Sequence, residues 1–218
     1  MRTSIRRFIA ATIGLSFLLV PAAASATLTP NFTQTINAGS LTANIYGSDD
    51  ATSVPSPTVS FPALNYSFQC QTSSATLGDS NDKVNVTNLA SGINTWNIAI
   101  APTNGTTATW TNGTNTYKYN DPTGTVAGCT NGQMTVDPSV ATLTDDCNGA
   151  CTANDSTVSK GTSAAFVSGT TNSVTLLKDT AGTAWEGYLT GIALTQKVPA
   201  LTPSGSYSLP MTITLAHT

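Results

Sequence analysis

The chain has 218 residues, of which 39% are hydrophobic and only 9% are charged, and its net charge is −3 at pH 7. All three arginines lie within the first 26 residues, so the remainder carries five lysines against eleven acidic residues, a net charge of −6. Nucleic acids and anionic membrane surfaces are bound through clustered Lys and Arg, and this composition therefore excludes both as partners.

Residues 1–26 are typical of a secretory signal peptide. A basic start is followed by an apolar run over Phe8–Val20, then by Pro21 and the small residues Ala24-Ser25-Ala26. The run is shorter than the roughly 20 residues that span a bilayer. We expect a signal helix, cleavage after Ala26, and a single exported domain over residues 27–218, secreted or held at the cell surface with no membrane span.

Short segments with alternating apolar residues then follow one another, separated by Gly, Pro, Asn and Asp. No stretch of this region has a sustained helical period, and its many Thr and few Glu and Lys favour strands. We predict an all-β fold, an antiparallel β-sandwich of about eight to ten strands. The segments cover residues 41–45, 64–70, 83–89, 96–100, 109–119, 132–137, 172–179, 191–198 and 206–216.

Two of these segments contain aromatic residues for which we predict different roles. Trp96 alternates with Ile98 and Ile100, which indicates an apolar face and a place in the core between two sheets. Trp110 and Tyr117 flank an Asn-Gly pair typical of a hairpin turn, with Tyr119 just beyond. This hairpin is the predicted ligand-binding surface; the alternative is a cross-strand pair that only stabilises the hairpin.

Four cysteines in an exported chain predict disulfide bonds, and they allow three pairings. We favour Cys70–Cys129 together with Cys147–Cys151. The second pair closes the short sequence CNGAC and would pin a long polar loop over residues 137–163.

The chain has few candidate catalytic residues. The one histidine, His217, lies next to the C-terminus, and the one glutamate, Glu186, follows Trp185 in what we expect to be a turn. We predict no enzyme activity and no cofactor. A calcium site is a weaker hypothesis, because oxygen ligands gather in one loop, although such residues are also common in turns. The candidate ligands are Asp145, Asp146, Asn148, Asn154 and Asp155.

Two motifs resemble the WxL domain of bacterial surface proteins. The family has a strand, a Gly-containing turn and a Trp-x-Leu strand, and it ends with a Pro, a Gly-x-Tyr and a second Trp-x-Leu strand. Ile98 stands in place of the first Leu, and Ile213 stands where the second Trp would be expected. The matching residues are Val86, Gly92, Trp96 and Ile98, then Pro203, Gly205, Tyr207 and Leu215.

The resemblance implies an exported β-sandwich that associates non-covalently with the cell wall or with other surface proteins. One alternative is a pilin-like or adhesin subunit that assembles by strand addition. Another is a carbohydrate-active enzyme, for which Glu186 would be the candidate acid.

Overall fold

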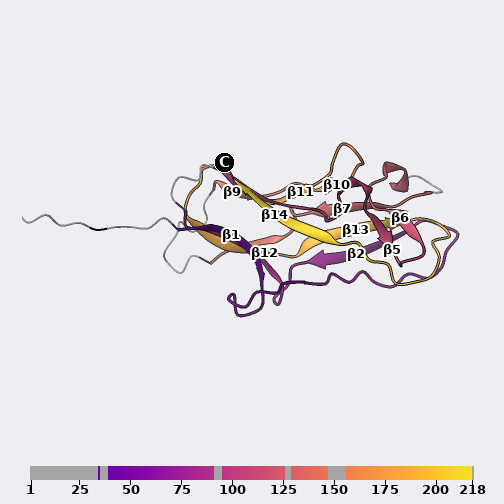
Figure 1. The fold of residues 1–218 in the computed structure, drawn as a ribbon, viewed down its shortest axis with the longest axis horizontal. Coiled ribbons are helices and arrows are strands. Elements are labelled where there is room, and N and C mark those ends of the chain that lie inside the picture. The colour runs from indigo at the N-terminus through magenta and orange to yellow at the C-terminus, as the bar shows by residue number, and fades with distance from the viewer. Residues whose placement is uncertain (1–33, 35–38, 91–94, 126–128, 147–155, 218) are drawn as a thin grey trace, which may run out of the picture. The chain divides into compact units, whose positions relative to one another are not determined.

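A computed structural model describes Gln34 and residues 39–90, 95–125, 129–146 and 156–217. The architecture belongs to one compact unit, Asn37–Thr218. Its described residues form fourteen strands and two short 3-10 turns, Gly105–Thr107 and Pro122–Thr125 (Figure 1). The predicted all-β antiparallel sandwich is confirmed, whereas the expected signal helix lies outside the described residues.

Two four-stranded antiparallel sheets continue into each other. The first has the order β1-β3-β12-β8, formed by Leu41–Tyr46, Lys83–Asn88, Trp185–Thr190 and Thr142–Asp145. The second has the order β10-β7-β13-β2, formed by Ala164–Ala165, Gln133–Asp137, Ile192–Val198 and Gln71–Leu77.

The junction between these two sheets lies at Gly191, the one residue between β12 and β13. Its φ of 78° is a backbone conformation that side-chain-bearing residues rarely adopt, so glycine permits the bend. On either side of it, Leu189 pairs with Val84 of β3 and Ile192 pairs with Leu77 of β2. The chain therefore passes from one sheet to the other without leaving the ladder.

A third sheet has the order β14-β4-β11-β9, and a separate two-stranded hairpin joins β5 to β6. Pro210 precedes β14, the edge strand, as a residue without an N–H is expected to do. The third sheet is formed by Met211–His217, Trp96–Pro102, Val174–Asp179 and Val158–Lys160, and the hairpin by Thr109–Thr111 and Thr116–Lys118.

The core joins inward-facing residues of the third sheet to those of the first two. Trp96 is 1% exposed and stacks on Trp185 with ring centroids 5.9 Å apart, so its predicted role as a core anchor is confirmed. Trp185 is also fully buried and belongs to β12. The expected turn at Trp185 and Glu186 is therefore wrong, and both residues lie in a central strand.

Two further segments differ from the sequence-based expectation. Residues 64–70, predicted as a strand, form none; Tyr66 and Phe68 are exposed, and the strand begins afterwards, at Gln71. The predicted loop 137–163 contains two strands, β8 and β9. The turn after β7 is short, and the chain then forms β8, which pairs with β12. The fourteen strands exceed the eight to ten expected because no predicted segment covers β8, β9, β10 or β12, and the hairpin segment forms two strands.

The disulfide Cys70–Cys129 is present, with a Cα–Cα distance of 5.9 Å. It ties the residue before β2 to the segment that leads into β7, at one end of the second sheet. This half of the predicted pairing is confirmed. Cys147 and Cys151 lie outside the described residues, as does the centre of the loop that they were expected to pin.

Candidate functional site

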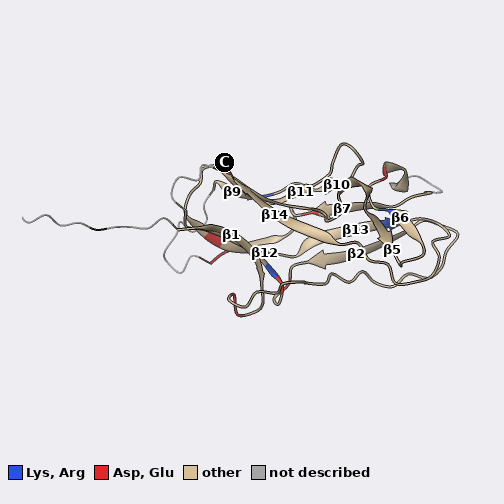
Figure 2. Cartoon of the chain, in the orientation of Figure 1, with Lys and Arg blue, Asp and Glu red and all other residues tan. Residues whose placement is uncertain are grey.

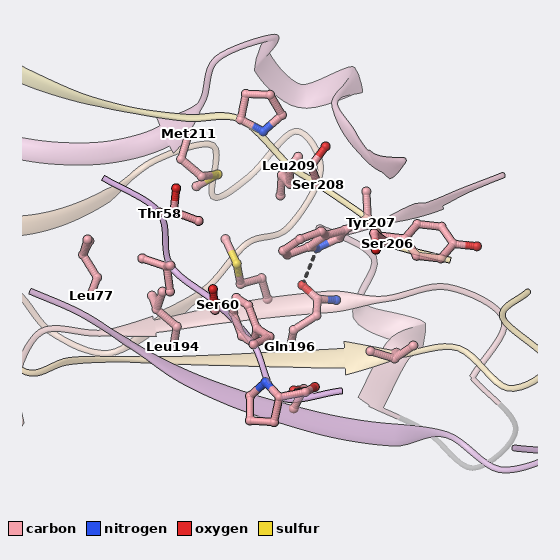
Figure 3. A pocket seen from close by; sticks show the side chains of 18 of the residues that line it. Thr58, Ser60, Leu77, Leu194, Gln196, Ser206, Tyr207, Ser208, Leu209 and Met211 are labelled. Carbon is pink, nitrogen blue, oxygen red and sulfur yellow. Dashed lines mark hydrogen bonds between the residues drawn. The ribbon is translucent and has the colours of Figure 1, made fainter. Parts of the chain in front are cut away.

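A cavity of about 1070 Å³ lies where the first two sheets and the third sheet meet at one flank of the sandwich. Strands β1, β2, β13 and β14 contribute to its walls, and Figure 3 shows Leu77, Leu194 and Gln196 on one side and Leu209 and Met211 on the other. These residues come from segments more than a hundred positions apart, so only the folded chain forms the site.

An extended segment, residues 55–66, crosses this cavity, and we call it the strap. Pro57, Val59 and Phe61 are half-buried, while Thr58 and Ser60 between them are exposed, which is the alternation of a strand. In the described part of the chain, none of its backbone N–H groups donates to another backbone carbonyl. Three of its residues, Pro55, Pro57 and Pro62, have no N–H to donate, so it stays outside the sheets.

Four aromatic rings close one end of the cavity. Trp110 stacks on Tyr117 with ring centroids 6.1 Å apart, and it packs edge-on against Phe61 of the strap with centroids 5.6 Å apart. The ring centroids of Tyr117 and Tyr207 are 5.2 Å apart. The indole Nε1–H of Trp110 donates to Gln196 Oε1 at 2.8 Å (Figure 3). These contacts join four separate parts of the chain into one aromatic wall.

Hydrogen bonds in the turn between β5 and β6 position the hairpin that carries Trp110 and Tyr117. Asn112 Oδ1 accepts hydrogen bonds from the N–H groups of Thr114 and Asn115, and Gly113 has a φ of 88°. The predicted Asn-Gly hairpin is therefore confirmed. Thr111 and Ser208 exchange both backbone hydrogen bonds, which holds the segment carrying Tyr207 against the hairpin.

Gly205 permits that close approach. A Cβ at this position would lie 2.5 Å from the Asn112 Nδ2 atom, which is closer than real contacts allow. Tyr207 is held from the other side, because its hydroxyl donates to the Pro203 carbonyl at 2.9 Å. The Pro and Gly-x-Tyr of the second motif thus build one end of the cavity.

Among the described residues that line the cavity, none is charged. Figure 2 shows the strap and β14 without any Lys, Arg, Asp or Glu. Burial, and the nearby Tyr207, hold the pKa of the Tyr117 phenol well above its usual value, and burial also raises the pKa of Tyr207. The cavity therefore offers apolar surface, aromatic faces and neutral hydroxyl and amide groups, but no acid–base pair.

The structure separates the three predicted ligand-binding residues. Trp110 and Tyr117 line the cavity, half-buried rather than exposed. Tyr119 is fully buried, packs edge-on against Phe166 at 5.2 Å, and donates to the Gly105 carbonyl at 3.4 Å. The prediction for Tyr119 is wrong, because successive side chains past the hairpin reach the core rather than the cavity.

The residues of the WxL-like motifs divide between core and cavity. Trp96 and Ile98 are buried in β4, and Leu215 of β14 pairs directly with Ile98. Gly205 and Tyr207 line the cavity. Val86 is buried in β3 of the first sheet, and Gly92 lies outside the described residues. The described motif residues are therefore spread over two sheets and the loop before β14.

Only part of the hypothetical calcium site is described. The Trp185 indole donates to Asp145 Oδ1 at 2.7 Å, and the backbone N–H of Asp146 donates to the Glu186 carbonyl at 2.9 Å. Within the described ranges, no three His, Cys, Asp or Glu side chains gather closely enough to hold a metal ion. The candidates Asn148, Asn154 and Asp155 lie outside the described residues.

Sequence reasoning missed the strap and Gln196. The alternation of Pro57, Val59 and Phe61 is a signal that could have indicated an extended segment facing the core. Gln196 lies on the same face of its strand as Ile192 and Leu194, so the alternation placed it inward, although a glutamine in a strand is ordinarily exposed. It is 2% exposed and bonded to Trp110.

Comparisons with family models, with curated proteins and with solved structures found no match to this chain. In the part of the chain that the structure describes, no helix has the length and apolarity needed to cross a membrane. The site is therefore interpreted from its own residues.

Proposed function

We propose that the protein is a secreted, non-catalytic cell-surface protein whose cavity binds a neutral extended chain. This partner is a cell-wall polymer or a segment of another surface protein, and the association is non-covalent. The observation that carries the proposal is the cavity itself, which is lined with aromatic rings and small polar groups and has no charged side chain among its described residues.

The dimensions and chemistry of the cavity support a chain as the ligand. Small-molecule pockets typically measure about 300–1,000 Å³; this cavity, at about 1070 Å³, stands at the upper end of that range and is lined by all of the strap. Aromatic faces pack well against apolar side chains and against the C–H faces of sugar rings. An ionic ligand would lose its hydration here without gaining an opposite charge.

The WxL-like motifs support a surface location, because Gly205 and Tyr207 build one end of the cavity. The enzyme alternative gains no support from the site. Glu186 lies on β12, where Thr87 Oγ1 donates to its Oε1 at 3.1 Å, and it is not among the residues that line the cavity.

Sedimentation of the purified protein with isolated bacterial cell walls tests the proposal. We expect the wild type to sediment with walls, and added salt to change this little because the cavity is uncharged. Tyr66→Ala should weaken binding, since Tyr66 lines the cavity and is 61% exposed, so its loss leaves the core intact.

Tyr188→Ala is the matched control. Tyr188 is a half-buried aromatic residue on β12, beneath Lys83, and it is not among the lining residues. Equal loss of binding in both variants, or release of the wild type by salt alone, would contradict the proposal.

A further inference from the structure

We propose that the exposed rings of Tyr66 and Phe68, which we call the platform, stack on a neutral polysaccharide whose chain continues into the cavity. The inference rests on the proposed function, because it names the partner as a glycan rather than a segment of another surface protein. Four observations carry it: the clustering of exposed apolar residues, the fixed backbone beneath the rings, the uncharged groups beside them, and the small extent of the patch.

Exposed apolar side chains gather at the platform. Tyr66 is 61% exposed and Phe68 is 76% exposed, and their ring centroids lie 5.9 Å apart with the ring planes at 79°. Leu64 and Leu201 are also exposed, and the Leu201 N–H donates to the Ser67 carbonyl, so their two segments adjoin. Single exposed apolar residues are ordinary, whereas a cluster of them marks an interaction site.

This clustering explains the alternation that predicted a strand over residues 64–70. Leu64, Tyr66 and Phe68 alternate with polar residues, yet the segment forms no strand and these side chains are exposed rather than part of the core. Tyr66 lines the cavity and Phe68 does not. The two rings therefore lead from the cavity to the outer surface, where a ligand can reach them.

The backbone beneath the rings is held from several sides. The Ser67 carbonyl accepts the Leu201 N–H at 2.8 Å, and Ser67 Oγ accepts the Gln69 N–H at 2.9 Å. The next residue, Cys70, is bonded to Cys129. Leu201 has a φ of 59°, a strained conformation for a residue with a side chain, and such strain is concentrated at functional sites. Because the segment is already fixed, binding a ligand costs little ordering of the protein.

The groups around the platform are polar but uncharged. Residues 51–78 and 198–216, which supply the platform and much of the cavity wall, contain no Lys, Arg, Asp or Glu. Asn65 and Gln69, which flank the two rings in the sequence, expose neutral amides. A sugar ring has apolar C–H faces and a rim of hydroxyl groups, so it needs aromatic surface together with neutral donors and acceptors. An ionic polymer would gain no opposite charge from these segments.

The small extent of the platform favours a glycan over a protein. Stable protein interfaces involve about 20–30 residues on each side, whereas the exposed apolar set here comprises Leu64, Tyr66, Phe68 and Leu201. A polysaccharide needs only a narrow strip, because each sugar ring can stack on one aromatic ring. The platform, followed by the aromatic wall of the cavity, forms such a strip.

Calorimetric titration of the exported chain, residues 27–218, with cellohexaose and with chitohexaose tests the inference. Both probes are uncharged chains of sugars with equatorial substituents, so every ring offers flat C–H faces. We expect at least one of them to bind with a dissociation constant below about 1 mM, and added salt to change this little. Phe68→Ala should raise the dissociation constant at least about fivefold, because a stacking face is lost.

Two further variants make the test specific. Phe68→Trp keeps an aromatic face, so it should retain binding, and its indole fluorescence should change when the sugar is added. Val140→Ala is the matched control: Val140 is 62% exposed and lies in the turn between β7 and β8, away from the platform segments. This variant should bind as the wild type does.

Three results would overturn the inference. The first is that neither hexasaccharide binds the wild type. The second is that Phe68→Ala and Val140→Ala bind equally well. The third is that salt alone releases the sugar, which would indicate binding through charges elsewhere on the surface.

The platform and the proposed function can fail separately, because the sugar titrations are made without cell walls. If the wild type sediments with walls but binds neither hexasaccharide, the inference fails and the proposed function stands. If a hexasaccharide binds through Phe68 but walls are not bound, the inference stands and only the wall-directed part of the proposed function fails.

Discussion

A hydrogen bond joins the aromatic wall to the sheet beneath it. Gln196 is 2% exposed, its Oε1 accepts the Trp110 indole N–H at 2.8 Å, and its Nε2 donates to the Lys197 carbonyl at 2.6 Å. Both ends of the buried amide are therefore satisfied. A buried donor that loses its acceptor costs more than the bond itself contributes, so this contact can be tested by removing one partner.

We predict that Gln196→Leu lowers the free energy of unfolding by about 1–3 kcal/mol, because it leaves the Trp110 N–H half-buried without an acceptor. Urea denaturation measures the change. The double variant Gln196→Leu/Trp110→Phe removes the donor as well, and it should lose less than the sum of the two single changes. Strict additivity would show that the bond holds no coupling energy.

Tyr117 gives the molecule a pH dependence at alkaline pH. Burial, and the neighbouring Tyr207, raise the pKa of Tyr117 in the folded chain, so the folded state holds this proton more tightly than the unfolded state. Stability should therefore be unaffected below about pH 10, the ordinary tyrosine value, and should fall as the pH rises above it. Urea midpoints on both sides of this pH should fall less steeply for Tyr117→Phe; identical slopes would contradict the assignment.

At the scale of elements, the strap differs from every strand around it. It has the alternation of a strand and half-buried apolar side chains, but in the described part of the chain its N–H groups make no bond to another backbone. Protection from hydrogen exchange depends on such bonds, whereas side-chain packing alone provides little.

We predict that amides of the strap exchange with solvent much faster than those of β13, which is hydrogen-bonded on both sides by β2 and β7. Hydrogen–deuterium exchange followed by mass spectrometry measures the difference, with β13 as the internal control. Strong protection of the free strap would show that it pairs with the sheet.

Element by element, alternating apolar residues predicted most strands correctly, although residues 64–70 alternate and form no strand, and strands without this alternation were missed. The alternation of Trp96, Ile98 and Ile100 predicted β4 correctly, and the Asn-Gly pair predicted the hairpin. Strand β2, QTSSATL, was missed because most of its residues are small and polar. Its exposed positions alternate with only a few buried ones. Strand β12 was missed because Gly187 breaks its pattern; a Cβ there would collide with the Trp185 ring.

The cavity was less predictable than the strands. Trp110 and Tyr117 were identified from the hairpin alone, but their partners Phe61, Tyr207 and Gln196 come from three distant parts of the chain. No local pattern encodes that meeting, because it depends on how the edges of the sheets come together. The burial of Tyr119 has the same origin: its ring meets Phe166, which local periodicity does not place.

At the scale of the whole molecule, the Cys70–Cys129 bond closes a sequence separation of 59 residues. We predict that Cys70→Ser/Cys129→Ser lowers the free energy of unfolding by about 4 kcal/mol, because the bond restricts the unfolded chain. Thermal or urea denaturation measures the loss. The control is Cys147→Ser/Cys151→Ser: a bond between these near neighbours in sequence would close a much shorter loop, so its loss should cost less. Equal costs would contradict the entropic explanation.

Strands β12, β13 and β14 have a consequence for when the molecule can fold. They are the last strands described, and they supply partners to all three large sheets: β12 to β3 and β8, β13 to β2 and β7, and β14 to β4. Earlier strands such as β2 and β4 cannot complete their ladders until residues 185–217 have been synthesised. A chain that crosses a membrane as a thread would thus stay unfolded throughout its passage, and its sheets would form only once its final strands had emerged.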